Sequence, residues 1–432
     1  MTIYSRSALP MLLRVLWLPS PLSRPTQQLE MLARYIKISG AVAFSAAALC
    51  STAVMAVEPA AIRLGPLYMA PTLSVETSHT DNLFRSANDP KSTLILTTLP
   101  RVETWLQDGN NTYLLGYQIE DFRYSSSHED DFTDQQVDGK IHHEFTARHA
   151  VNAYARFYDG HEERGTGLSE GDIADLIDEP IALERLGYGG DYTFGANASR
   201  GRLNLAYDFE DLEYTNFRDI TRFRNREQDR LGGTFFWALA PRTDLVAEVR
   251  YYDNAYDEVS TTDAAGSRDS EEWNYYLGAE WDATARTSGS VRLGWYERDY
   301  ESNARDATNG FSWEVSVDYA LRSYSIFNLA TRRFSQETNG LGDAIDAEEY
   351  EASWQHDWSG LSSTYLRVLY GNDDYTGITR EDDRWSAEAR YQRRVRRWFD
   401  LGCGYRYEER DSEAASLDYD RNVFFVEAQF SL

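Results

Sequence analysis

A repeating two-residue alternation of apolar and polar side chains constrains this sequence more than any other feature. The stretch FSWEVSVDYALRSYSIFNLATRRF, residues 311–334, shows it most clearly. Phe311, Trp313 and Val315 begin one apolar face, while Ser312 and Glu314 begin the opposite polar face. Because successive side chains of a strand point to opposite sides, this period predicts a strand with one apolar face. The alternation resumes after a turn of one or two residues, which predicts a second, antiparallel strand.

The same alternation recurs from residue 67 to the end of the chain in runs of about 10–14 residues, and it predicts eighteen strands. Other apolar faces are formed by Leu203, Leu205, Tyr207 and Phe209; by Leu245, Ala247, Val249 and Tyr251; by Trp273, Tyr275, Leu277, Ala279 and Trp281; by Val291, Leu293 and Trp295; by Trp385, Ala387, Ala389 and Tyr391; and by Phe399, Leu401, Cys403 and Tyr405.

The predicted connections also alternate between two lengths. Short turns are expected near His149, Ser199, Pro241, Ala285, Ser323, Gly360 and Val395. Between them are polar loops near 78–92, 125–131, 160–184, 214–226, 257–269, 301–308, 338–346, 376–380 and 411–417. Short turns at one end and long loops at the other are typical of bacterial outer-membrane barrels.

Composition narrows the fold class further. The chain has a formal net charge of −27 and a mean hydropathy of −0.57, but 14% of its residues are aromatic, too many for a disordered acidic protein. Beyond residue 56 no apolar stretch is long enough for a transmembrane helix. We therefore predict an all-β protein, a transmembrane antiparallel outer-membrane β-barrel of about 18 strands with short periplasmic turns and longer extracellular loops. Its apolar faces meet lipid and its polar faces line water.

The first residues resemble a targeting region. Residues 31–56 have a charged start with Arg34 and Lys37, an apolar centre, and small residues before a cleavage point after Ala56, which predicts a secretory signal peptide. We interpret residues 1–30 as a mis-annotated N-terminal extension, with translation beginning at Met31. Residues 57–66 are expected to form a short periplasmic segment, and residues 67–432 the single barrel domain. Cys403 is then the only cysteine of the exported chain, so no internal disulfide is expected.

The last run, NVFFVEAQFSL, is expected to be the strand that closes the barrel. Its outward face ends with Phe430 and Leu432. Closing strands usually end on an aromatic residue that the barrel-assembly machinery reads, so this machinery is an expected partner through Phe430 and Leu432. The other expected partners are outer-membrane lipid, lipopolysaccharide, a polysaccharide substrate and periplasmic export proteins.

Three segments carry a family resemblance. They are LYMAPTLSVETSHTDNLFR (67–85), LPRVETWLQDGNNTYLLGYQIEDFRY (99–124) and YGGDYTFGANASRGRLNLAYDFEDLEYTNF (188–217). Through them the chain resembles the putative β-barrel porin type 2 family, and more narrowly the outer-membrane proteins encoded in exopolysaccharide operons. The resemblance covers essentially the whole exported chain. It implies a barrel of about 18 strands that acts as a secretion channel for a polysaccharide, and it does not identify the polymer.

The polar faces of the predicted strands carry both signs of charge. Without residues 1–56 the chain has 38 basic and 69 acidic residues, a net charge of −31, since that segment holds five of the 43 basic and one of the 70 acidic residues. Inward acids are expected at Asp208, Glu210, Glu248, Glu280, Glu314, Asp318, Glu388, Asp400 and Glu408. The candidate substrate path has arginines at Arg156, Arg202, Arg250, Arg292, Arg298, Arg332, Arg367, Arg390 and Arg406, and tyrosines at Tyr154, Tyr158, Tyr252, Tyr296 and Tyr365.

Two interpretations of this lumen remain open. Guanidinium groups bind carboxylates of an acidic polymer in a bidentate geometry, and tyrosines offer stacking faces for sugar rings. Alternatively, the arginines and carboxylates satisfy one another and brace the wall. The barrel size is compatible with both, because a barrel of this strand number leaves an aqueous channel unless loops fill it. The 160–184 loop, with Gly165, Gly167 and Gly171, is the expected constriction or lid.

Other functions find little support. Acidic runs at 129–131, 172–179, 373–374 and 381–383 match no calcium-loop spacing, so we interpret them as solvated surface. No nucleophile, Walker or zinc signature is present, so we expect no enzyme activity, no cofactor and no metal site. The negative charge disfavours nucleic acid. The function predicted is a channel that assists exopolysaccharide export; the alternatives are a general diffusion porin and a closed barrel that scaffolds a secretion complex.

Overall fold

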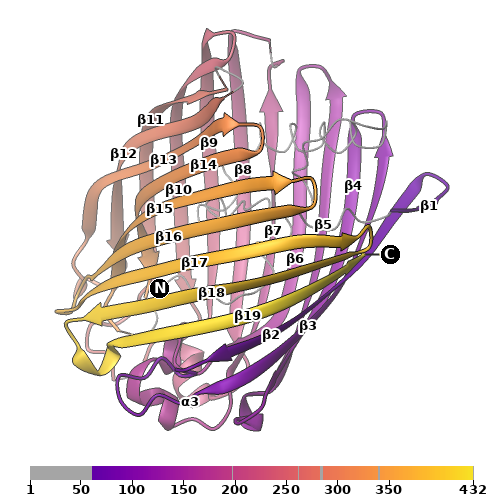
Figure 1. Ribbon diagram of the computed structural model, residues 1–432. Coiled ribbons are helices and arrows are strands. Elements are labelled where there is room, and N and C mark those ends of the chain that lie inside the picture. Colours follow the sequence, from indigo (N-terminus) through magenta and orange to yellow (C-terminus); the bar gives the residue numbers. More distant parts are fainter. Residues whose placement is uncertain (1–60, 197, 261, 283–285, 339–340, 432) are drawn as a thin grey trace.

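The computed structural model describes residues 61–196, 198–260, 262–282, 286–338 and 341–431. In this part of the chain, eighteen antiparallel strands, β2 to β19, close into one barrel (Figure 1). The strands are β1 (Ile62–Leu64), β2 (Leu67–Thr80), β3 (Thr93–Asp108), β4 (Asn111–Tyr124), β5 (Phe132–Thr146), β6 (His149–Glu162), β7 (Ile181–Phe194), β8 (Gly201–Tyr214), β9 (Arg226–Ala240), β10 (Thr243–Tyr256), β11 (Ser270–Trp281), β12 (Thr287–Tyr300), β13 (Thr308–Arg322), β14 (Ser325–Glu337), β15 (Ala344–Ser359), β16 (Ser362–Tyr375), β17 (Glu381–Arg396), β18 (Phe399–Ser412) and β19 (Tyr419–Ser431).

Each barrel strand pairs with its neighbours in the sequence, and the last strand pairs with the first. β19 runs antiparallel to β2, with Val423 opposite Thr80 and Ser431 opposite Thr72. Closure leaves no free sheet edge, so the backbone N–H and C=O groups find partners within the wall, as lipid requires. The predicted closed barrel of about 18 strands is confirmed, and β1 only adds a short hairpin with the start of β2.

The two faces of the wall differ as the alternation predicts. Leu277, Phe424 and Val426 are large apolar side chains that are 70%, 58% and 54% exposed on the outer surface. Their cross-strand neighbours are also apolar; Leu277, for example, lies opposite Leu293. An apolar belt of this kind is stable against lipid and not against water, so the outer wall is the lipid-facing surface.

The two ends of the barrel also differ. Most connections at one end are turns of two residues, such as 323–324 between β13 and β14, and this end faces the periplasm in outer-membrane barrels. The other end carries the long loops, with the short helix α3 (Arg218–Thr221) and 3₁₀ turns at His128–Asp130, Gly167–Ser169, Gly171–Asp175, Arg222–Arg224 and Ala415–Leu417. The predicted alternation of short and long connections is confirmed, although the turn expected near Ala285 lies outside the described residues.

The helices in the described ranges are all too short and too polar to cross a membrane. The extension 1–30 and the signal peptide 31–56 lie outside the described residues, as do residues 57–60 of the expected periplasmic segment. Leu432, expected at the barrel end, lies outside them too. These remain predictions.

The long loops pack on small apolar clusters at the mouth of the barrel. Ala174, from the loop between β6 and β7, is buried with Phe84, Ile95 and Phe122. Ile177, further along the same loop, packs with residues of β7 and β8. This loop, residues 163–180, is therefore anchored along its length, and it is called the mouth loop below.

Candidate functional site

The predicted lumen arginines all lie on inward positions of their strands. In β12, for example, Arg292 and Arg298 alternate with Leu293 and Trp295, which are exposed on the lipid-facing side. The inward set comprises Arg156, Arg202, Arg250, Arg292, Arg298, Arg332, Arg367, Arg390 and Arg406.

Neighbouring strands supply these arginines with carboxylates. In β10, Glu248 accepts hydrogen bonds from Arg250 Nε at 2.6 Å and from Arg292 Nε at 2.8 Å. Arg250 also binds Glu314 through both terminal nitrogens, at 2.6 and 3.0 Å. Arg292 is also paired with Glu280. A continuous chain of ion pairs thus crosses four strands, β10 to β13.

Most of the other arginines repeat this arrangement elsewhere on the wall. The shortest pair of each is Arg202–Asp244 at 2.6 Å, Arg298–Glu337 at 2.8 Å, Arg332–Glu349 at 2.7 Å, Arg367–Glu351 at 2.7 Å, Arg390–Glu388 at 3.1 Å and Arg406–Glu388 at 2.7 Å, and Arg298 also pairs with Glu272 at 2.9 Å. Arg156 stands opposite Asp138 on the next strand. The lumen therefore brings guanidinium groups and carboxylates together in alternation, as the predicted inward acids imply.

The candidate tyrosines are held in the same wall. Tyr154 donates a hydrogen bond to Asp208 at 2.6 Å, and Tyr158 donates one to Asp134 at 2.7 Å. Tyr252 lies under the guanidinium group of Arg230. Tyr296 and Tyr365 are only 2% and 6% exposed, so neighbouring side chains cover their rings.

The inward chemistry is polar and charged, without a catalytic constellation. Within the described ranges, no group of three or more His, Cys, Asp or Glu side chains is arranged to hold a metal ion. The ion pairs and hydrogen bonds of the wall join neighbouring strands, and their charged groups are those that a polar solute in the lumen would meet. Both interpretations of the lumen are compatible with these contacts.

A set of arginines at the short-turn end was not among the predicted site residues. These side chains are exposed and lie in or beside the turns. One of them, Arg200, lies 4.9 Å above the ring of Trp237. The set comprises Arg148, Arg200, Arg242, Arg286, Arg322, Arg396 and Arg397. Among the described residues, these arginines outnumber the exposed carboxylates beside the short turns, Asp108 and Asp282, of which Asp282 pairs with Arg242, so the periplasmic rim is basic although the chain as a whole is strongly acidic.

Carboxylates gather at the opposite end, on the outer wall. Asp253 faces Asp229 on one neighbouring strand and Glu271 on the other, and Glu271 in turn faces Asp299. Like charges directly opposite each other destabilise a sheet, so these positions are not explained by strand pairing. The outward set comprises Asp159, Glu184, Asp211, Glu213, Glu227, Asp229, Asp253, Glu271, Glu297, Asp299, Asp346, Glu348, Asp374, Glu381, Asp383, Glu409, Asp411 and Asp420.

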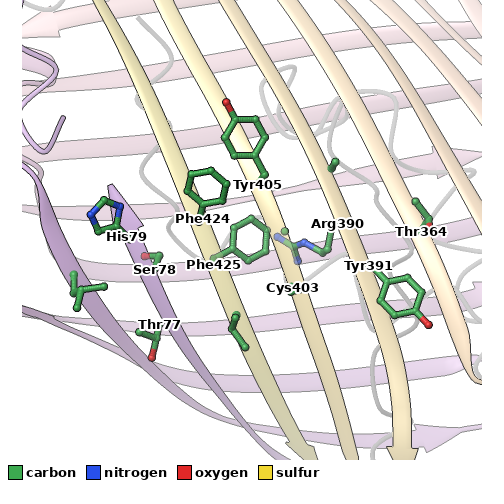
Figure 2. Close-up of a pocket in the computed structure, with 14 residues that line it drawn as sticks. Thr77, Ser78, His79, Thr364, Arg390, Tyr391, Cys403, Tyr405, Phe424 and Phe425 are labelled. Atoms are coloured by element: carbon green, nitrogen blue, oxygen red, sulfur yellow. The ribbon is translucent and has the colours of Figure 1, made fainter. Parts of the chain in front are cut away.

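A shallow apolar groove of about 580 Å³ lies where β17, β18, β19 and β2 meet (Figure 2). Small side chains, Ala389 and Cys403, form part of its lining, with the aromatic rings of Tyr391, Tyr405 and Phe424 nearby. Most of these side chains belong to the lipid-facing set. The groove is therefore a feature of the outer wall and not part of the lumen.

A second group of loops meets at Arg305, in the connection between β12 and β13. Arg305 donates to Asp263 at 2.7 Å and to the carbonyl oxygen of Ser267 at 2.8 Å, and it is also paired with Asp343. Arg268 donates to the carbonyl oxygen of Gly342 at 3.1 Å. One buried arginine thus joins the loops 257–269, 301–307 and 338–343.

This junction should come apart in acid. Burial raises the pKa of Asp263, but hydrogen bonds from Arg305 and the Ala265 N–H lower it more, so the pKa lies below its usual value. The stabilisation is then complete above the ordinary aspartate pKa of about 3.9 and is lost as pH falls through the lower folded value. We expect cleavage of these loops to be slow and constant from pH 5 to 8 and several-fold faster below about pH 4. Thermolysin at neutral pH and pepsin in acid would measure it.

The matched variants are Asp263→Asn and Asp306→Asn. Asp263→Asn should already accelerate cleavage at neutral pH, because it removes the carboxylate that Arg305 binds. Asp306 is exposed in the same loop group, so its substitution should change little. Equal cleavage rates for the two variants would show that Asp263 does not hold the loops.

Comparison with known proteins yields one family and several structures. The family model described as Putative beta-barrel porin 2 matches residues 55–432. No curated protein matches the chain. Among solved structures, OccK2 (OpdF) of Pseudomonas aeruginosa is 10% identical with a TM-score of 0.46, over 84% of this chain and 98% of its own. The copper transporter OprC is 11% identical with a TM-score of 0.45, over 86% and 82%. OpdL of Pseudomonas aeruginosa is 11% identical with a TM-score of 0.45, over 85% and 99%.

Proposed function

The chain belongs to the Putative beta-barrel porin 2 family, and on that premise we propose that it is a channel that assists the export of an exopolysaccharide. The family and the fold place the protein in the outer membrane as a β-barrel of the porin type. The substrate class is supported by the resemblance of the sequence to proteins encoded with exopolysaccharide genes. The anionic character of the polymer is supported by the arginines described above.

One observation carries the proposal: in a strongly acidic protein, arginines are present at both the periplasmic rim and the lumen wall of the barrel. They are exposed at the periplasmic rim, where an exported polymer enters, and they continue along the lumen wall. A basic entrance attracts an anionic solute and raises its local concentration. Guanidinium groups then offer bidentate contacts to successive carboxylates of the polymer.

A general diffusion porin is the second candidate. It is supported by the pairing of lumen arginines with carboxylates of the wall, which leaves less charge for a dedicated ligand. The third candidate is a closed barrel that acts as a scaffold. The family and the fold are those of channels, and no catalytic step is proposed.

The test is conductance of the purified protein in planar bilayers, with tetragalacturonic acid as an acidic oligosaccharide. We expect a steady pore that the acidic ligand blocks and that neutral maltotetraose does not. Arg332→Gln should weaken the block about tenfold, since a hydrogen bond to a charged group contributes about 1.5–3 kcal/mol. Arg292→Gln and Arg367→Gln should act in the same direction.

The matched control is Arg333→Gln. Arg333 is the next residue along β14 but faces outward and pairs with Asp346, so its loss should leave the block unchanged. A pore that tetragalacturonic acid does not block would favour the diffusion porin. The absence of any conductance would favour the scaffold.

A further inference from the structure

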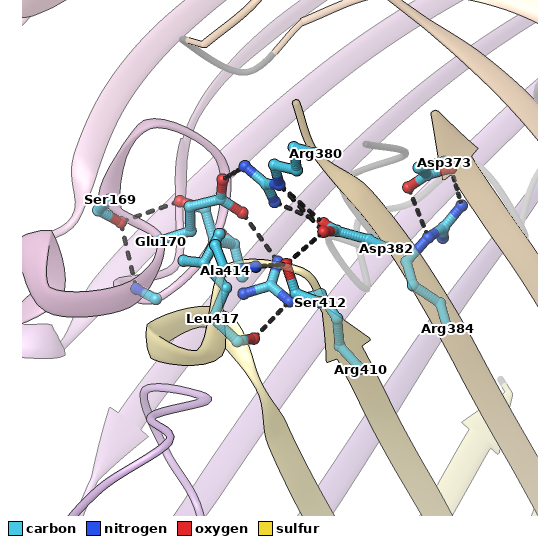
Figure 3. A network of polar contacts seen from close by, with 12 residues as sticks. Ser169, Glu170, Asp373, Arg380, Asp382, Arg384, Arg410, Ser412, Ala414 and Leu417 are labelled. Atoms are coloured by element: carbon cyan, nitrogen blue, oxygen red, sulfur yellow. Dashed lines mark hydrogen bonds and ion pairs between the residues drawn. The ribbon is translucent and has the colours of Figure 1, made fainter. Parts of the chain in front are cut away.

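Glu170 in the mouth loop bridges two arginines of the opposite wall (Figure 3). Its Oε1 accepts a hydrogen bond from Arg380 at 2.6 Å, and its Oε2 accepts one from Arg410 at 2.8 Å. Arg380 precedes β17 and Arg410 lies in β18, 210 and 240 residues along the chain. The three side chains are 8%, 3% and 2% exposed. A single carboxylate therefore occupies a buried site made by two other segments.

The two arginines are held in place by contacts that do not involve Glu170. Arg380 forms a two-pronged pair with Asp382, with Nε 3.0 Å from Oδ1, and lies 4.1 Å above the ring of Tyr375. Arg410 Nε donates to the carbonyl oxygen of Leu417 at 2.7 Å. Burial lowers the pKa of Arg380, but its hydrogen bonds with Asp382 and Glu170 outweigh this and raise the pKa above its usual value. The positions of both guanidinium groups are thus supported by contacts that would remain if Glu170 moved away.

The mouth loop reaches this site because glycines adopt backbone conformations that other residues rarely adopt. Gly171, next to Glu170, has a φ of +62°, and an added Cβ would lie 2.6 Å from a methyl carbon of Leu417. Gly165 has a φ of +82°, and an added Cβ would overlap the backbone of Phe84. The loop is therefore seated closely on its neighbours, and departure of Glu170 requires the segment around Gly171 to move away from Leu417.

We propose that Arg380 and Arg410 form a binding site for the carboxylate groups of an acidic polysaccharide, and that Glu170 occupies this site when no polymer is present. The proposal rests on the proposed function and adds a ligand site at the extracellular mouth. Exchange of one carboxylate for another keeps the number of ion pairs constant, so the polymer replaces the internal ligand without leaving a buried charge unpaired. The mouth loop then loses its contact with the β17–β18 wall as the polymer arrives.

Binding of tetragalacturonic acid to the purified full-length chain in detergent, measured by calorimetry, tests this site. Glu170→Gln should raise the affinity about tenfold, because it weakens the internal competitor. Gly171→Ala should do the same without a change of charge, since it displaces the loop. Arg380→Gln and Arg410→Gln should abolish the gain. Asp178→Asn, an exposed carboxylate of the same loop, is the matched control and should bind as the unchanged protein does.

The outcomes separate this proposal from the proposed function. Equal affinity for Glu170→Gln and Asp178→Asn, or binding that survives loss of both arginines, overturns the mouth site even if the pore conducts and is blocked through Arg332. Inorganic phosphate that binds as tightly as tetragalacturonic acid overturns the saccharide ligand. Tighter binding by Glu170→Gln in a protein that never conducts supports the mouth site and overturns only the channel.

Discussion

Replacement of Glu248 by leucine should lower the free energy of unfolding of the barrel by about 3–5 kcal/mol, the range seen when one partner of a buried ion pair is removed. Glu248 is fully buried and binds Arg250 and Arg292 at 2.6 and 2.8 Å. Without this carboxylate, the buried guanidinium groups of Arg250 and Arg292 each lose one ion-pair partner. Urea unfolding of the folded barrel, followed by tryptophan fluorescence, measures the change.

The control for this prediction is Glu297→Leu. Glu297 lies on the outer face of β12, where it is exposed, so the same substitution should change stability by less than about 1 kcal/mol. The double variant Glu248→Leu with Arg292→Met should recover part of the lost stability, because it replaces both members of a buried pair by apolar side chains, while Glu280, which loses Arg292, is 31% exposed and can be solvated. Similar losses for Glu248→Leu and Glu297→Leu would mean that the ion pairs do not brace the wall.

That result also bears on the two interpretations of the lumen. A large loss at Glu248 would show that the β10–β13 arginines stabilise the barrel. It would not exclude a role in transport, because side chains that brace the wall can also line a solute path. The conductance series at Arg332 measures the transport role separately.

The barrel architecture could be predicted from the sequence because lipid imposes it locally. Each strand must present apolar side chains at every second position, as Trp313, Val315 and Val317 do in β13. The same alternation places Arg332 inside and Arg333 outside, so the inward positions follow from the pattern alone. In the same way, the lengths of the turns predicted which end of the barrel faces the periplasm.

The contacts between side chains of distant segments could not be predicted. Arg292 and Glu248 are 44 residues apart, and Glu170 and Arg380 are 210 apart. No period or motif links such pairs, because the pairing depends on strand tilt and on how the mouth loop folds inward. The sequence indicated that this loop is long and glycine-rich, but not which wall it meets.

The outer carboxylates were missed although a signal was present. In β10 the outward alternation runs Val249, Tyr251 and then Asp253, so the acid continues the lipid-facing series beyond the aromatic residue. The interpretation of the sequence considered only the acidic runs of the loops. The basic turns had a comparable signal, since Arg148, Arg242 and Arg397 fall within predicted short turns.

Gly278 is the strand position where an added methyl group should disturb the pairing of two strands most and so lower the free energy of unfolding most. It lies in β11 opposite Arg292, and an added Cβ would overlap the backbone oxygen of Val291 and lie 3.0 Å from the Cα of Arg292. Both obstacles are backbone atoms, which move only if β11 and β12 separate. We expect Gly278→Ala to lower the free energy of unfolding by about 3 kcal/mol, at the upper end of the usual cost of overpacking.

Gly139→Ala in β5 separates this close approach from the general effect of replacing a strand glycine. An added Cβ at Gly139 meets only the backbone oxygen of Leu114, at 3.9 Å, which is an ordinary contact. That variant should be neutral or slightly stabilising, since alanine restricts the unfolded chain more than glycine does. Equal stability of the two variants would contradict the close approach at Gly278. A large difference would show that the pairing of β11 with β12, the strand that carries Arg292, depends on the absence of a side chain at position 278.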